Sequence, residues 1–120
     1  MPSLLVHSST GPESPTRASL AFLVARAALA AGVDVSVFLA GDAVSLVRVT
    51  IRDALTGVGT GSLAESFEAL VSGGSRLYLS GASSAARGIT SDDLDGISAE
   101  FATPARLVEL TFAHDRVLTY

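Results

Sequence analysis

The sequence predicts a three-layer α/β/α sandwich built around a five-stranded, mostly parallel sheet, with residues 1–120 forming one domain. Strand-like apolar runs alternate with helical segments along the chain, and no internal repeat or linker interrupts them. Hydrophobic residues make up 48% of the chain and charged residues 17%, so it can bury a substantial core. Strands separated by helices need crossover connections, which favour a parallel sheet with helices on both faces.

The first strand and helix are marked by changes in residue type. Residues 4–6 are apolar and predict a buried strand, followed by a polar, turn-forming segment. We expect Ser14 to cap the next helix, with Pro15 in its first turn and Gly32 at its left-handed end. Residues 33–39 are rich in β-branched side chains and predict the second strand.

The middle of the chain is less regular. A short helix is expected over residues 43–47, whereas the mixed pattern of residues 48–61 predicts only a loop with some helical turns. Ser62 and Glu65 then have the spacing of a capping box and open a helix that ends at Gly73.

The last third contains three further strands. The third strand is expected over residues 76–79 and leads into a loop of small residues, 80–88. The remaining predicted elements are a helical turn over 90–94, a strand over 99–102, a helix opened by Thr103 and Pro104, and a strand over 116–119.

Composition excludes several kinds of chemistry. All 8 basic residues are arginines, so no lysine can form a Schiff base or serve a P-loop. The net charge of -4 argues against nucleic-acid binding. No apolar run is long enough to span a membrane and no secretory signal is evident, so we expect a cytoplasmic protein. The excess of apolar residues favours a homo-oligomer.

The loop after the third strand is the main candidate site. Ligands of parallel α/β proteins bind beyond the carboxyl ends of strands, where small residues allow close approach to the backbone. Hydroxyls, backbone amides and an arginine would suit a small anion or carboxylate, or a protein partner. The candidate ligand-binding residues are Ser80, Gly81, Ala82, Ser83 and Arg87, with Ser9 and Thr10 from the loop after the first strand. Alternatively, the small residues pack at a subunit contact and Arg87 pairs with an acidic neighbour.

An enzymatic role is the alternative hypothesis. Ser80 or Ser83 would act as a nucleophile on a small anionic or acyl substrate, with His7 as the base and Arg87 assisting. This requires the first and third strands to be neighbours, as they often are in such sheets. However, no G-x-S-x-G elbow is present.

No cofactor or metal is expected. His7 and His114 are the only histidines, and their surroundings show no metal-ligand spacing. The glycines at 57, 59 and 61 precede a helix and could cradle a phosphate, but no Walker lysine is present, so a flexible loop before a capped helix is the better interpretation.

Three segments together resemble the DsrE/DsrF-like family of small α/β subunits, which are best known for sulfur relay. These segments are the first strand with its exit loop through Ala18, residues 37–44, and residues 80–88, completed by Asp115 to Leu118 at the end of the chain. The resemblance implies a flavodoxin-like, DsrE-like sheet of five parallel strands and assembly into homotrimers or hexamers. It also implies, in active members, a persulfide-carrying cysteine after the third strand.

The chain contains no cysteine, and by its spacing to Arg87 and Gly88, Ser80 occupies the place of that cysteine. Ser83 matches a second cysteine of some members. A serine hydroxyl has no thiolate form at neutral pH and cannot hold transferable sulfur. We therefore expect a binding or assembly subunit that is not itself a sulfur carrier.

Overall fold

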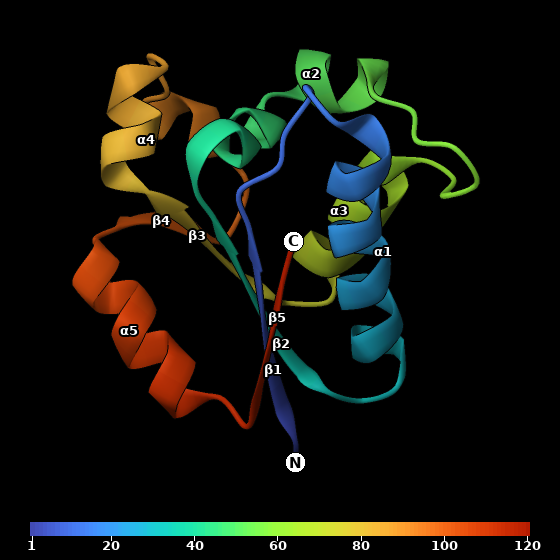
Figure 1. The fold of residues 1–120 in the computed structure, drawn as a ribbon, viewed down its shortest axis with the longest axis vertical. Helices are drawn as coiled ribbons and strands as arrows, with labels where there is room; N and C mark the ends of the chain where they lie inside the picture. The colour runs from blue at the N-terminus through green and yellow to red at the C-terminus, as the bar shows by residue number, and fades with distance from the viewer.

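Five parallel strands form one sheet in the order β4-β3-β2-β1-β5, with helices on both faces (Figure 1). The computed structural model describes residues 1–120. The strands are β1 (Ser3–Ser8), β2 (Asp34–Leu39), β3 (Arg76–Ser80), β4 (Ala99–Ala102) and β5 (Arg116–Thr119). The predicted α/β/α sandwich with five strands is confirmed.

Two helices cover one face of the sheet and one covers the other (Figure 1). The first face carries α1 (Pro15–Ala30) and α3 (Leu63–Ser72), and the second carries α5 (Pro104–Ala113). Four shorter elements complete the chain: η1 (Gly41–Val47), α2 (Val49–Ala54), α4 (Gly81–Ala86) and η2 (Ser91–Leu94). Both α2 and α4 lie at the upper end of the sheet in Figure 1, where the strands finish. No helix has the length and the apolar run that crossing a membrane requires.

The strand order contradicts the expectation that the first and third strands are neighbours. β1 lies between β2 and β5, and β2 separates it from β3. The reason is that each of the first three crossovers advances by one strand in the same direction, and only the connection through α5 returns to the far side of β1.

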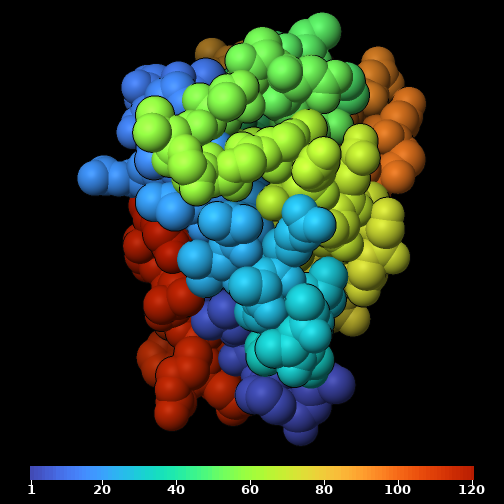
Figure 2. Space-filling model, turned by 90° about the vertical axis from the view of Figure 1, so that its right-hand side faces the viewer, coloured from blue at the N-terminus to red at the C-terminus, as the bar shows by residue number.

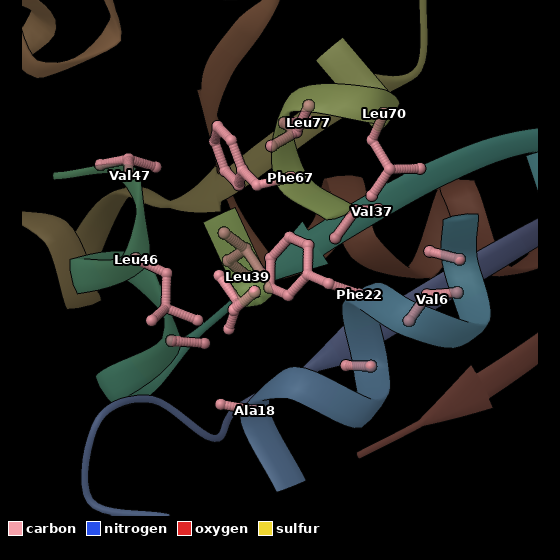
Figure 3. Close-up of a cluster of buried hydrophobic side chains, with 14 of the residues drawn as sticks. Val6, Ala18, Phe22, Val37, Leu39, Leu46, Val47, Phe67, Leu70 and Leu77 are labelled. Carbon is pink, nitrogen blue, oxygen red and sulfur yellow. The ribbon is translucent and has the colours of Figure 1, made fainter. Parts of the chain in front are cut away.

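The core is unevenly divided between the two faces. Nineteen buried residues form the cluster between the sheet, α1, α3 and η1. Figure 3 shows Phe22 from α1 and Phe67 from α3 in this cluster. Their ring centroids are 5.7 Å apart. The cluster under α5 has only five buried members: Leu5, Phe38, Tyr78, Ala102 and Leu110. The face under α5 is therefore the less well covered one.

Several helix ends behave as predicted. The Ser62 hydroxyl accepts a hydrogen bond from the Glu65 amide and the Thr103 hydroxyl accepts one from the Arg106 amide. Gly32, with φ of 84°, follows the end of α1. Ser14 precedes α1 as expected, but its side chain makes no capping hydrogen bond, so that expectation was wrong. Its carbonyl instead accepts the Ala18 amide as the first helical hydrogen bond.

One segment that was predicted as a loop with some helical turns contains a short helix, and a second that was predicted as a loop is largely helical. Residues 48–61 include α2 and end in a loop that lies against the beginning of α1, where the Val58 amide donates to the Thr16 hydroxyl at 3.1 Å. This loop, yellow-green in Figure 2, crosses the blue start of α1. The predicted loop 80–88 is largely the helix α4. Three of the six residues of α4 are alanines, which favour a helix, and Gly88, with φ of 68°, follows in the left-handed conformation common after a helix end.

Candidate functional site

The site begins at Ser80, where β3 ends and α4 begins. The Ser80 hydroxyl accepts a hydrogen bond from the Ser83 amide at 3.2 Å and thereby caps α4. Gly81 is the first helical residue, and Ala82 is exposed beside it. The expected binding loop is thus a short, capped helical segment at the carboxyl edge of the sheet.

Ser83 joins α4 to the end of the neighbouring strand. Its hydroxyl accepts a hydrogen bond from the Gly41 amide at 2.9 Å, directly after β2. Because β2 and β3 are adjacent and parallel, their exits lie at one edge and this bond can form.

Arg87 is held by an ion pair across the same junction. Its Nε and Nη2 atoms donate to Oδ1 of Asp42 at 3.2 and 3.0 Å, and its Nη1 donates to the Ser83 carbonyl oxygen at 3.0 Å. The two side chains are 32% and 55% exposed. The structure therefore supports the alternative in which Arg87 pairs with an acidic neighbour, and it identifies that neighbour as Asp42.

The loop after β1 lies next to Asp42 and extends this edge. A methyl group placed on Gly11 would lie 2.1 Å from the Asp42 carbonyl oxygen, so the two backbones are in direct contact. Ser9 is exposed, whereas Thr10 is buried and its amide donates to the Ser8 hydroxyl at 3.3 Å. The three segments follow the strand order β1, β2, β3, and the exit of β2 lies between the other two.

His7 lies apart from this group. It belongs to β1, and its ring packs edge-on against Phe38 of β2 with centroids 5.7 Å apart. Its Nε2 atom is buried without a hydrogen-bond partner, and burial lowers the pKa of its ring. With β2 between them, β1 and β3 are about 10 Å apart. No hydrogen bond joins His7 to Ser80 or Ser83, so the structure does not assemble a serine–histidine pair.

The remaining candidates do not form a metal centre or a deep pocket. No three histidine or carboxylate side chains lie close enough together to hold a metal ion. His114 ends α5, with Nδ1 2.6 Å from the Leu110 carbonyl oxygen. None of the five hollows in the structure is lined by a residue of segment 80–87. In a single chain, the edge around α4 is thus a shallow surface.

This edge and the sheet order can be compared with known proteins. The model of the DsrE/DsrF-like family matches residues 3–120. The chain belongs to this family. The resemblance inferred from its sequence is therefore confirmed. This member of the family contains no cysteine.

Solved structures with the same fold include the ychN protein and two proteins described as of unknown function. The ychN protein from E. coli has a TM-score of 0.79 at 22% identity, with full coverage of both chains. BT1422 from Bacteroides thetaiotaomicron has a TM-score of 0.71 at 12% identity and covers 98% of this chain and 94% of its own. MTH1491 from Methanobacterium thermoautotrophicum has a TM-score of 0.70 at 15% identity, with full coverage of both chains. No protein with a curated description matches the sequence.

Asp42 is the residue of this DsrE/DsrF-like site that sequence reasoning did not assign. Its position directly after the second strand was a usable signal, because neighbouring parallel strands bring their exits together. The pairing of Asp42 with Arg87 also requires the second and third strands to be adjacent, which the sequence pattern does not indicate.

Proposed function

We propose that this chain is a cysteine-free DsrE/DsrF-like subunit that assembles with copies of itself into a homotrimer or hexamer. In that assembly, the edge from Ser80 to Arg87 serves as a binding surface for a small anionic ligand or a protein partner, without carrying sulfur. The observation that supports assembly most directly is the thin covering of the α5 side of the molecule.

The α5 side exposes apolar side chains that a stable monomer would normally bury. In α5 only Leu110 is buried, while Val108 and Phe112 are 56% and 86% exposed. All four residues of β5 are exposed, and of its two apolar side chains Val117 is paired with Leu5 on the α5 side, whereas Leu118 is paired with Val6 on the opposite face. Val108 and Phe112 are four residues apart and lie on the same face of α5, and neighbouring exposed apolar side chains are typical of interaction sites. A second copy of the chain is the occupant that the family resemblance favours.

Native mass spectrometry at micromolar concentration tests the assembly. We expect a trimer or hexamer for the natural chain and a monomer for the Phe112→Glu variant, because a buried unpaired carboxylate is costly in an apolar interface. Val58→Glu is the matched control, since Val58 is equally exposed at 85% but lies in the glycine loop. A monomer of the natural chain at micromolar concentration would overturn the assembly proposal.

The binding part of the proposal depends on Arg87 and its ion pair. Arg87 supplies the positive charge of this edge, and its Nε and Nη2 atoms already donate hydrogen bonds to Asp42. An anion would bind through the guanidinium, the Ser80 and Ser83 hydroxyls and the neighbouring amides. The shallowness of the edge favours a pocket completed by a second subunit or a partner surface.

Phosphate titration of the assembled protein, followed by amide chemical shifts, tests this binding. We expect Arg87→Gln to abolish shifts at Ser80 to Ser83 and Asp42→Asn to strengthen binding by removing the competing carboxylate. Arg26→Gln, an exposed arginine on α1, is the control and should leave the shifts unchanged. Shifts at this edge that persist in Arg87→Gln, or their absence in the natural protein, would contradict an anion site here.

A further inference from the structure

Arg52 is a buried cation with an unusual set of partners. It lies in the last turn of α2 and is 8% exposed. Its guanidinium carbon is 4.0 Å from the centre of the Phe67 ring. Both of its hydrogen bonds are donated by Nη1, to the carbonyl oxygens of Leu46 and Val47 at 3.1 and 2.5 Å. These contacts hold the guanidinium in one orientation.

No carboxylate forms an ion pair with this cation. The three ion pairs of the structure join Arg48 to Asp93, Arg87 to Asp42 and Arg106 to Glu109. The Nε atom of Arg52 is buried without any hydrogen-bond partner. Burial lowers the pKa of Arg52, against the opposing effect of Asp53 and Glu68, yet an arginine stays protonated near neutral pH. A buried cation that is hydrogen-bonded only to neutral carbonyl groups is costly, so the position favours a counter-charge.

A hollow of about 250 Å³ lies beside this guanidinium. Its apolar wall consists of Phe67, Val71 and Ile97, and the exposed residues Glu68 and Ser72 complete its lining. Glu68 forms no ion pair with Arg52, so the hollow presents a positive and a negative group that are not paired with each other.

We propose that this hollow binds a small aliphatic α-amino acid. Its carboxylate accepts hydrogen bonds from the Arg52 guanidinium, its ammonium group pairs with Glu68, and its side chain packs on Val71 and Ile97. A simple carboxylate would be repelled by Glu68 and a simple amine by Arg52, whereas a zwitterion satisfies both groups. The volume and the apolar wall suit a ligand of the size of leucine.

The experiment is an amide chemical-shift titration of the natural protein with leucine, isovalerate and isoamylamine, which carry both charges, the carboxylate alone and the ammonium alone. We expect saturable shifts at Arg52, Val71 and Ile97, with leucine binding about tenfold more tightly than either analogue, because each lost charged hydrogen bond weakens binding by that order. In Glu68→Gln, the affinity for leucine should fall to that for isovalerate.

Two further variants complete the test. Glu65→Gln is the matched control, since Glu65 is exposed on the same helix but does not line the hollow, and it should bind leucine normally. Arg52→Gln should lose binding, and if it fails to fold, Glu68→Gln alone decides. The proposal is overturned if millimolar leucine gives no saturable shifts at these residues, if isovalerate binds as tightly as leucine, or if Glu68→Gln leaves leucine binding unchanged.

Discussion

At the scale of single residues, the edge around α4 depends on polar contacts that are partly open to water. The ion pair of Arg87 with Asp42 joins α4 to the exit of β2, but both side chains are about a third or more exposed. Water and salt screen such pairs, so their geometry fixes the position of a side chain more than it stabilises the fold.

We predict that Asp42→Asn lowers the free energy of unfolding by less than about 1 kcal/mol, because an exposed ion pair contributes little. Urea denaturation checks this value, with Arg87→Gln as the partner variant that removes the same pair. A loss of several kcal/mol in either variant would mean that the pair supports the fold, and that its residues are not free to exchange partners with a ligand.

His7 makes the stability of the protein depend on pH. Burial lowers its pKa in the folded chain, and the unfolded chain takes up the proton near pH 6.5. Unfolding therefore binds a proton between the two pKa values, so the contribution of His7 is complete above about pH 6.5 and is lost as the pH falls toward the folded pKa.

We predict that His7→Phe reduces the loss of stability between about pH 7.5 and about pH 5.5, because phenylalanine has no proton to take up. Thermal melts of the natural protein and the variant at both pH values measure the difference. An equal loss of stability in the two proteins would show that the folded ring titrates like the unfolded one.

At the scale of elements, the sequence predicted helix ends that are marked by a capping side chain or by a glycine. Ser62, Thr103 and Gly32 mark ends by capping or by a left-handed conformation, and these signals are local. Segment 80–88 was predicted as a loop, and its small residues are compatible with either a loop or a helix. The capping hydrogen bond of Ser80 and the alanines of α4 favour the helix.

The composition of the site was harder to predict than its elements. Ser80, Ser83 and Arg87 lie in one segment, so their proximity follows from the sequence. The contact with Gly41 and Asp42, and the separation of His7, depend on the sheet order. Strand order depends on the direction in which each crossover connection runs, and local sequence patterns do not indicate that direction.

The contact between the exits of β1 and β2 gives a test at this scale. We predict that Gly11→Ala destabilises the protein by several kcal/mol, because the added methyl group would lie 2.1 Å from the Asp42 carbonyl oxygen. Gly81→Ala is the comparison, since its methyl group would meet only the Ala102 carbonyl oxygen at 3.7 Å and alanine favours the helix. Urea denaturation of both variants should show a large loss for Gly11→Ala and no loss for Gly81→Ala.

At the scale of the whole molecule, the two faces of the sheet are covered unequally. One face packs nineteen buried residues against α1, α3 and η1, and the other packs five beneath α5. In the proposed assembly, neighbouring copies would cover the thinly packed face and add to the stability that the larger cluster supplies.

We predict that the melting temperature rises with protein concentration, because assembly binds only the folded chain. In Phe112→Glu the melting temperature should be lower and independent of concentration. Differential scanning calorimetry over a hundredfold range, about the span that mass action needs for a clear shift, measures both proteins. A constant melting temperature in the natural protein would indicate a monomer or an assembly that does not stabilise its subunits.

The pairing of β5 with β1 has a consequence for folding. Leu4 pairs with Arg116 and Val6 with Leu118, so one side of β1 has no partner until residues from the far end of the chain arrive. On the ribosome, β1 to β4 can therefore form a sheet while that side of β1 is still an open edge. The same open edge offers a place for the β5 of another copy, so exchange of this strand between two chains is the misassembly that we predict.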